Sequence, residues 1–345
     1  MESDLSLSLL VGLSAGVFFV EAAVYPMPSA NTPEVAELHA TIQEWDLPTK
    51  GARPYATAVT PDGSIWFTEE MINRIGRVNP KTGECKEYPL TEDSNARPHG
   101  IAVDRNGSIW YTANSGGFIG KLEPSTGKVA VFKMPDPNAK DPDSLAFDSK
   151  GILWFTLPTA NMVGRLDPAS GAITLKPVPT ENARPNSILV LKRDLLAFCE
   201  AGASKIGFIA PGTFAIWEFP LPPGSRSRRL ALAADQDTLY FTDFVGGNLG
   251  KMDLSIGALM LLPSPGGLDS NPYGLAITPD GMVWYTETGS QPNNIIRFNP
   301  RLSTFARAPI PFAVGVVHDL TATPDGRVYL ASSGVDKVGA VAAPK

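Results

Sequence analysis

The chain has 345 residues, of which 43% are hydrophobic and 19% are charged, so it can bury a sizeable globular core. Its net charge of −6 leaves no basic excess to neutralise phosphates, which argues against a general nucleic-acid-binding protein. Glycine and proline number 32 each, and so many turn-forming residues favour short strands over long helices.

The N-terminal segment contains the only long apolar run, residues 5–20. This run is shorter than the roughly 20 residues of a membrane helix and is typical of an export signal. We expect residues 1–23 to be a signal peptide of a periplasmic or secreted protein, or else a retained anchor, the one case in which a membrane partner is expected. Glu2 and Asp4 stand where an export signal has basic residues, so a mis-assigned start and a cytoplasmic protein stay open. Residues 24–38, rich in proline, alanine and glutamate, are expected to be a linker.

From residue 39 onward the sequence repeats with a period of about 44 residues, counted between equivalent, mostly aromatic positions. Each copy contains a Pro-x-Gly-like segment, an Asp-Gly or Asn-Gly hairpin turn, an Ile-Trp-Phe-Thr-like strand, an Ile-Gly-Arg-Val-like strand and a fourth strand. Seven copies of four short antiparallel strands predict an all-β, seven-bladed propeller. The two cysteines, Cys85 and Cys199, fall in different copies, which predicts neither a disulfide nor a zinc site. The aligned positions are Trp66, Trp110, Trp154, Ala197, Tyr240, Trp284 and Tyr329.

Closure of the ring can also be predicted. The seventh copy ends at Val341, after its third strand, and residues 42–48 ahead of the first copy match the fourth-strand pattern. The N-terminal strand should therefore complete the last blade and remove an exposed edge. Because the repeat is unbroken, we predict a single propeller domain over residues 39–345.

Candidate functional positions lie where the connection into each first strand and the loop between the second and third strands open on one face, near the central channel. Two sets of residues occupy these positions, one from each copy. Eleven residues before the aligned positions are Tyr55, His99, Asp143, Asn186, Arg229, Tyr273 and His318. Three residues after them are Glu69, Ala113, Leu157, Glu200, Asp243, Glu287 and Ser332.

The first set changes in type from copy to copy while its surroundings do not, which points to function. Two of the three histidines, His99 and His318, belong to it and fall on blades adjacent to that of Tyr55 in a closed ring. An imidazole can accept a proton near neutral pH, and a phenol can stabilise developing negative charge. The alternative is that each histidine is a solvated or capping side chain.

Charged residues near the same face also have two interpretations. Glu69 and Glu287 could hold Mg²⁺ or Ca²⁺, or could bond loop amides. Four arginines could steer an acidic substrate or pair with these carboxylates: Arg53, Arg97, Arg184 and Arg229.

Three segments carry a resemblance to a known family. Residues 97–103 (Arg-Pro-His-Gly-Ile-Ala-Val), 65–69 (Ile-Trp-Phe-Thr-Glu) and 74–78 (Arg-Ile-Gly-Arg-Val) resemble the streptogramin B lyases, also called virginiamycin B lyases. The likeness covers roughly residues 40–342. It implies a monomeric seven-bladed propeller that linearises cyclic depsipeptide antibiotics by Mg²⁺-dependent elimination at the ester. In that family a histidine removes a Cα proton and the metal stabilises the ester oxygens.

The resemblance transfers only some of the family's functional residues. Tyr55 matches its first-blade tyrosine and His318 its last-blade histidine, which makes both catalytic candidates. Tyr273 stands where the family has a second histidine, and the usual metal carboxylates fall on Val316 and on Ser332 or Ser333. The resemblance and the ring positions together give five candidates for contact with a small cyclic ester or peptide-like ligand: Tyr273, His99, Arg53, Arg97 and Arg229.

Three functions stay open at this point. The first is a lyase that opens a cyclic ester, with His318 as base, Tyr55 assisting and Mg²⁺ held by Glu287 or Glu69. The second is a non-catalytic exported propeller that binds a peptide, glycan or protein. The third is a lactonase-type hydrolase, whose metal would need Glu69, Asn186, Asp243 and Glu287 to converge.

Overall fold

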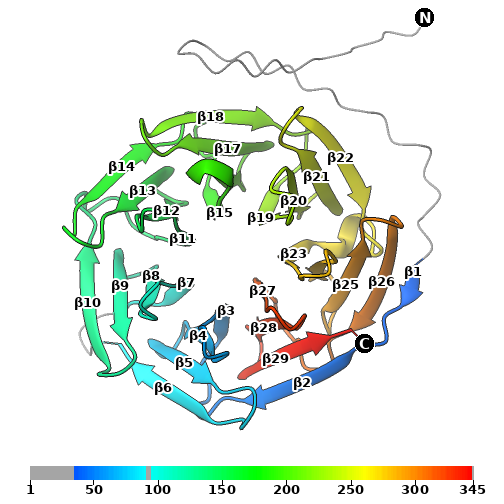
Figure 1. Ribbon diagram of the computed structural model, residues 1–345, viewed down its shortest axis with the longest axis horizontal. Helices are drawn as coiled ribbons and strands as arrows, with labels where there is room; N and C mark the ends of the chain where they lie inside the picture. The colour runs from blue at the N-terminus through cyan, green and yellow to red at the C-terminus, as the bar shows by residue number, and fades with distance from the viewer. Residues whose placement is uncertain (1–34, 91–94, 344–345) are drawn as a thin grey trace, which may run out of the picture.

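The computed structural model describes residues 35–90 and 95–343, which form a ring of seven β-sheets around a central channel (Figure 1). Each sheet is one blade with four antiparallel strands, the first beside the channel and the fourth toward the outside, and one blade has an added fifth strand. The predicted seven-bladed propeller is confirmed.

The strands follow chain order from blade to blade. Blade 1 consists of β3 (Pro54–Val59), β4 (Ile65–Glu69), β5 (Arg74–Val78) and β6 (Cys85–Pro89). Blade 2 consists of β7 (Pro98–Val103), β8 (Ile109–Ala113), β9 (Phe118–Glu123) and β10 (Lys128–Lys133). Blade 3 consists of β11 (Leu145–Phe147), β12 (Leu153–Leu157), β13 (Met162–Leu166) and β14 (Ile173–Pro177). Blade 4 consists of β15 (Pro185–Val190), β16 (Leu196–Glu200), β17 (Lys205–Ala210) and β18 (Ala215–Pro220).

The remaining blades have the same plan. Blade 5 consists of β19 (Ser227–Leu232), β20 (Thr238–Asp243), β21 (Asn248–Asp253) and β22 (Ala258–Pro263). Blade 6 contains β23 (Pro272–Ile277), β24 (Val283–Glu287), β25 (Asn294–Asn299) and β26 (Thr304–Pro309). Blade 7 combines β27 (Leu320–Ala322), β28 (Val328–Ser332) and β29 (Lys337–Ala342) with the N-terminal β2 (Thr41–Asp46). Two short 3₁₀ helices, η1 (Lys192–Asp194) and η2 (Leu268–Ser270), lie in loops.

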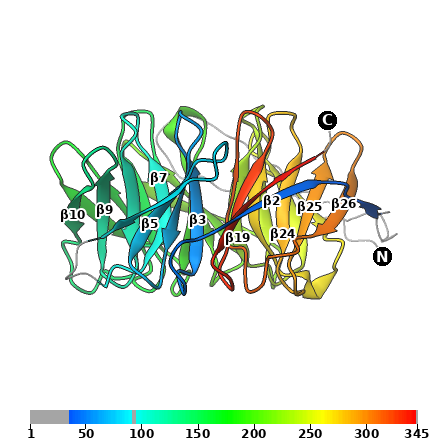
Figure 2. The ribbon, with the colours of Figure 1, turned by 90° about the horizontal axis from the view of Figure 1, so that it is seen from below.

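The ring closes where the sequence predicted. β2 pairs antiparallel with β29, from Thr41 opposite Ala342 to Asp46 opposite Lys337. In the edge-on view, blue β2 runs across the front of the ring (Figure 2). This pairing leaves blade 7 with four strands and covers the edge of β29.

A further strand precedes the closing strand. β1 (Val35–Glu37) pairs in parallel with β26, which gives blade 6 a fifth, outermost strand. These residues lie within the segment expected to be a linker. Residues 1–34, which include the candidate signal segment, lie outside the described residues. No helix in the described ranges is long and apolar enough to cross a membrane.

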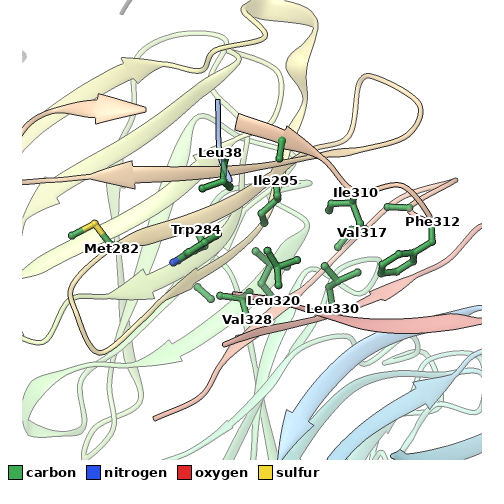
Figure 3. Packing of buried hydrophobic residues seen from close by; sticks show 14 residues of the cluster. Leu38, Met282, Trp284, Ile295, Ile310, Phe312, Val317, Leu320, Val328 and Leu330 are labelled. Atoms are coloured by element: carbon green, nitrogen blue, oxygen red, sulfur yellow. The ribbon is translucent and has the colours of Figure 1, made fainter. Parts of the chain in front are cut away.

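The core fills the spaces between neighbouring blades. Apart from Thr238 at the start of β20, second strands are buried along their whole length, because they pack against another blade on each face. Between blades 6 and 7, Trp284, Val328 and Leu330 belong to one buried cluster that also includes Leu38 (Figure 3). All seven aligned positions are at most 3% exposed and therefore belong to the core.

The Ile-Gly-Arg-Val pattern of the third strands has a packing cause. A Cβ atom on Gly76 would lie 2.1 Å from a ring carbon of Phe67 in the second strand. The equivalent glycines of blades 2 to 5 face a second-strand aromatic ring in the same way. These glycines therefore let two neighbouring strands accommodate one large ring between them. Both cysteines are free, as the sequence predicted.

Candidate functional site in the central channel

The seven predicted ring positions all come together in the channel. In blades 1, 2, 4, 5 and 6 each lies at a register shift between the first and second strands. Such an irregularity breaks the pairing and turns the side chain away from the regular sheet. We call these seven residues the channel belt: Tyr55, His99, Asp143, Asn186, Arg229, Tyr273 and His318.

Threonines of the second strands hold the belt backbone in place. The Thr112 hydroxyl accepts a hydrogen bond from Gly100 N in its own blade (2.8 Å) and donates one to Asp143 O in the next blade (2.8 Å). Blade 1 has the same bridge, in which Thr68 links Ala56 N to His99 O. Blade 5 repeats it with Thr242, so in three blades the Thr of the second strand fixes the backbone of a belt residue in the next blade.

One half of the belt is a stack of aromatic rings. Tyr55 lies between His99 and His318, with ring centroids 4.3 and 4.2 Å apart. Tyr273 meets His318 edge-on, at a centroid distance of 5.0 Å. Burial, with the nearby Tyr273 and Asp143, raises the pKa of Tyr55 well above its ordinary value. Its phenol therefore stays protonated and able to donate.

The other half is a chain of charged and amide groups. Nδ1 of His99 lies 3.2 Å from Asp143 Oδ1, and Asn186 donates to the other Asp143 oxygen at 2.6 Å. Arg229 donates to Asn186 Oδ1 at 2.7 Å and lies over the Tyr273 ring, 5.1 Å from its centroid. Since each belt residue contacts the next, the belt forms a complete circle.

His99 lies between two carboxylates. Its Nε2 is 3.4 Å from Glu70 Oε1, on the side opposite Asp143. Burial opposes the charged imidazole, but hydrogen bonds and charge from Asp143 and Glu70 prevail and raise the pKa of His99 to about 9. Burial likewise opposes the Glu70 charge, yet His99, Arg53 and Arg97 lower the pKa of Glu70 to about 2. At neutral pH the two residues form an ion pair.

His318 has the opposite environment. Neither of its ring nitrogens has a hydrogen-bond partner among the described residues, and both are closed to solvent. Burial, followed by the positive charges of Arg229 and His99, lowers the pKa of His318 to about 3. His318 is therefore a neutral imidazole with two free nitrogens, only one of which can carry a proton.

The arginines predicted as substrate contacts are paired within the protein. Arg53 Nε lies 3.2 Å from Glu70 Oε2, and Arg97 bonds the other Glu70 oxygen. Arg229 Nε lies 3.4 Å from Asp319 Oδ1. The belt residues Tyr55, Asp143 and Arg229 line a channel cavity of about 190 Å³ together with Asp319.

The two predicted metal ligands lie outside the belt. Glu69 is fully buried, and neither of its carboxyl oxygens has a hydrogen-bond partner among the described residues. Burial, with the nearby Glu87, raises the pKa of Glu69 to about 8. Glu287 accepts hydrogen bonds from Ser264 Oγ and Gly266 N, both at 2.6 Å. Neither residue makes a hydrogen bond or ion pair with the belt.

The described residues do not fit a magnesium ion. No three side chains of His, Cys, Asp or Glu within residues 35–90 and 95–343 are grouped to hold one. At the family's carboxylate positions, Ser333 Oγ donates to Val316 O and accepts from Val316 N. The Ser333 hydroxyl and the Val316 backbone therefore already satisfy each other's hydrogen bonds. Asp243, a ligand in the lactonase hypothesis, bonds Arg226 N, Gly246 N and Asn248.

Sequence reasoning missed Glu70 and Asp319. Both directly follow residues that it singled out, Glu69 and His318. Each lies one residue outside a regular strand, Glu70 after β4 and Asp319 before β27, so strand periodicity does not predict which way its side chain faces. The available signal was adjacency to a candidate residue.

Comparison with known proteins agrees with this architecture. The sequence model of the virginiamycin B lyase family matches residues 29–261. No curated protein sequence matches the chain.

Three solved structures are similar over most of their length. Virginiamycin B lyase from Staphylococcus aureus, in selenomethionine form, has a TM-score of 0.80 and 26% identity, covering 89% of this chain and 100% of that chain. A streptogramin B lyase has a TM-score of 0.80 and 25% identity, with 88% and 98% covered. A catalytically inactive variant of the Staphylococcus aureus enzyme with quinupristin has a TM-score of 0.79 and covers 89% and 100%, and its 24% identity shows the fold alone. Because the family model spans more than half of the chain, this protein belongs to the virginiamycin B lyase family.

Proposed function

We propose that the channel belt is a carbon–oxygen lyase site that opens a cyclic ester by elimination. The observation that carries the proposal is His318, a neutral imidazole with unpartnered nitrogens, beside the buried guanidinium of Arg229 and the protonated phenol of Tyr55. A general base, a fixed cation and a hydroxyl donor are the groups that proton abstraction next to an ester carbonyl requires.

His318 is the base in this proposal. It removes a proton from the carbon next to the carbonyl, the electron pair forms a carbon–carbon double bond, and the ester oxygen on the neighbouring carbon leaves as a carboxylate. No water is consumed. The low pKa of His318 makes it a weak base while the site is empty of substrate. Its proton affinity rises as negative charge develops on the substrate and offsets the charge of Arg229, one cause of that low pKa.

Arg229 is the cation of the proposed step. Asn186 and Asp319 fix the guanidinium, and Tyr273 lies against its face. A preorganised cation in a water-poor site stabilises a developing oxyanion far more than it would in water. Mg²⁺ was expected from the family resemblance, but Val316 and Ser333 replace its carboxylates, so no metal enters the proposed step. Belt residues are stacked and hydrogen-bonded to one another, and both His318 nitrogens are closed to solvent. Substrate must therefore displace neighbouring belt side chains to reach His318.

Liquid chromatography with mass spectrometry tests this proposal, with quinupristin as the first substrate, in Mg²⁺ and in EDTA. We expect a product of unchanged mass and shifted retention in both buffers. The variants His318→Ala and Arg229→Gln should each lower the rate by about 100-fold or more. A product heavier by one water would favour the lactonase hypothesis, and dependence on Mg²⁺ would contradict the role of Arg229.

A second candidate function is a non-catalytic propeller that binds a peptide, glycan or protein. Its supporting observation is that four large apolar side chains are exposed on loops of the face on which the belt lies, and such exposure often marks a binding surface. If the lyase assay gives no product, quinupristin binding that persists in His318→Ala would favour this function. The four side chains are Met71, Val245, Leu268 and Val314.

A further inference from the structure

A carboxylate is held between two arginines at the junction of blades 1 and 2. Glu70 starts the loop after β4, and its oxygens bond Arg53 from its own blade and Arg97 from the next. Each arginine lies two residues before a belt residue and has a left-handed backbone, with φ of 52° and 44°. Left-handed backbone favours glycine, so each arginine is held at some cost in backbone strain, and each makes an ion pair with Glu70.

Blade 4 repeats the arginine without the carboxylate. Arg184 lies two residues before the belt residue Asn186 and has a φ of 52°. The residue of its own blade that corresponds to Glu70 is Ala201, and that of the preceding blade is Pro158. Arg184 is exposed, and in the described part of the chain its guanidinium has no hydrogen bond or ion pair.

Blade 5 adds one arginine beside the same loop and a second one farther along the channel face. Nη1 of Arg226 donates to Ser204 Oγ at 2.8 Å, in the loop that begins with Ala201. The Arg228 guanidinium lies toward blade 6, 5.0 Å from the centroid of the Phe244 ring and 5.7 Å from that of Tyr273. Its Nε is buried without a hydrogen-bond partner among the described residues. No salt bridge to a described carboxylate involves either arginine, so neither guanidinium is neutralised by an ion pair.

We propose that the loop of residues 201–204, between blades 4 and 5, binds the carboxylate of a ligand. The ligand carboxylate would take the place that Glu70 fills between blades 1 and 2, with Arg184 on one side and Arg226 on the other. Ala201, which corresponds to Glu70, has only a methyl side chain and supplies no carboxylate of its own. The apolar part of the ligand would lie against Phe244 and Val245, whose side chain is 53% exposed.

The proposed carboxylate site does not depend on the lyase proposal, because the experiment that tests it measures ligand binding and not turnover. The proposed site also assigns the two roles predicted for the four arginines near the channel face, pairing with carboxylates of the protein or contact with an acidic substrate. Arg53, Arg97 and Arg229 pair with carboxylates of the protein, whereas Arg184 is left for a ligand.

The test is an NMR titration of the full chain with 3-phenylpropionate at low salt. We expect binding that weakens by about tenfold or more for the uncharged 3-phenylpropionamide and for Ala201→Glu, which supplies an internal carboxylate. Arg184→Gly should weaken binding as strongly, yet leave the melting temperature unchanged or higher because glycine suits the left-handed backbone. The melting temperature thus separates lost binding from misfolding even if Ala201→Glu folds poorly.

Arg193→Gly is the matched control. Arg193 is an exposed arginine of blade 4 with a φ of 61°, in the turn between the first and second strands at the opposite face. Arg193→Gly removes the same charge and puts glycine at the same kind of left-handed backbone as Arg184→Gly does. Binding of 3-phenylpropionate should therefore stay the same in Arg193→Gly. Absence of 3-phenylpropionate binding in the parent chain, or unchanged binding in Ala201→Glu and Arg184→Gly, would overturn the proposal. So would inorganic phosphate that binds as tightly as 3-phenylpropionate.

Discussion

At the scale of single residues, His99 and His318 show how neighbours set the charge of one side-chain type. Both are belt residues and both stack on Tyr55. Glu70 and Asp143 flank His99 and stabilise its charged form, whereas His318 has aromatic neighbours, no hydrogen-bond partner among the described residues and the positive charge of Arg229 nearby. One histidine is therefore a fixed cation and the other a neutral base.

NMR titration of the histidine ring signals can check this assignment, because the chain has only three histidines. We expect His99 to stay protonated up to a pKa of about 9 and His318 to stay neutral down to a pKa of about 3. Asp143→Asn should lower the pKa of His99, since it removes a carboxylate 3.2 Å from Nδ1. His39→Gln assigns the third signal. Titration of His99 near the ordinary value of about 6.5 would contradict the ion-pair description.

The belt positions could be predicted from sequence, but their partners could not. The spacing of eleven residues is fixed by the repeat, and in a closed ring that spacing alone puts Tyr55 and His318 on adjacent blades. The choice between Glu69 and Glu70 as the partner of His99 depends on which face each side chain takes where β4 ends. That local geometry is not contained in a repeat period.

At the scale of elements, the N-terminal strands differ in what they cover. β2 pairs over six residues with β29 and places Trp45 beside Tyr329 in the core. β1 pairs over three residues with the outer edge of blade 6. The repeat predicted β2 because it matches a fourth-strand pattern, whereas β1 is an additional strand with no counterpart in the other copies.

Truncation separates the two strands. A chain of residues 38–345 should still unfold cooperatively, with a small fall in melting temperature, because it keeps Leu38 and the whole of β2. A chain of residues 48–345 should aggregate or lose its cooperative transition, because it exposes the edge of β29 and removes Trp45 from the core. Trp45→Ala in the full chain should cost about 3–5 kcal/mol, measured by urea denaturation. Equal melting curves for the two truncated chains would show that β2 does not close the ring.

At the scale of the whole molecule, blades 1 and 4 contain the same buried acidic arrangement. Glu87 accepts hydrogen bonds from Thr49 and Arg74, and Glu218 accepts them from Thr180 and Lys205. Beside each lies a fully buried carboxyl group, Glu69 or Glu200, whose oxygens have no hydrogen-bond partner among the described residues. Burial, followed by the adjacent glutamate, raises the pKa of both to about 8.

Two raised carboxyl pKa values make the stability of the ring depend on pH. In the unfolded chain these groups lose their protons near the ordinary value of 4.5, whereas in the folded chain they keep them up to about 8. Their stabilising contribution is therefore complete below pH 4.5 and is lost as pH rises through 8. The slope across this interval is about 1.4 kcal/mol per pH unit for each group. His99 acts in the same direction between about pH 6.5 and 9, because its folded pKa is also raised.

A double variant, Glu69→Gln with Glu200→Gln, isolates the two carboxyl groups from His99. The amide has nearly the size of the carboxyl group and has no proton to lose. We expect the parent and the variant to have similar free energies of unfolding at pH 5, and the variant to become more stable than the parent as pH rises to 8, with a constant difference above it. Urea denaturation at pH 5, 7 and 9 measures that difference. A difference that does not change with pH would mean that both carboxyl groups ionise at their ordinary pKa, and that the spaces between the blades admit enough water to solvate them.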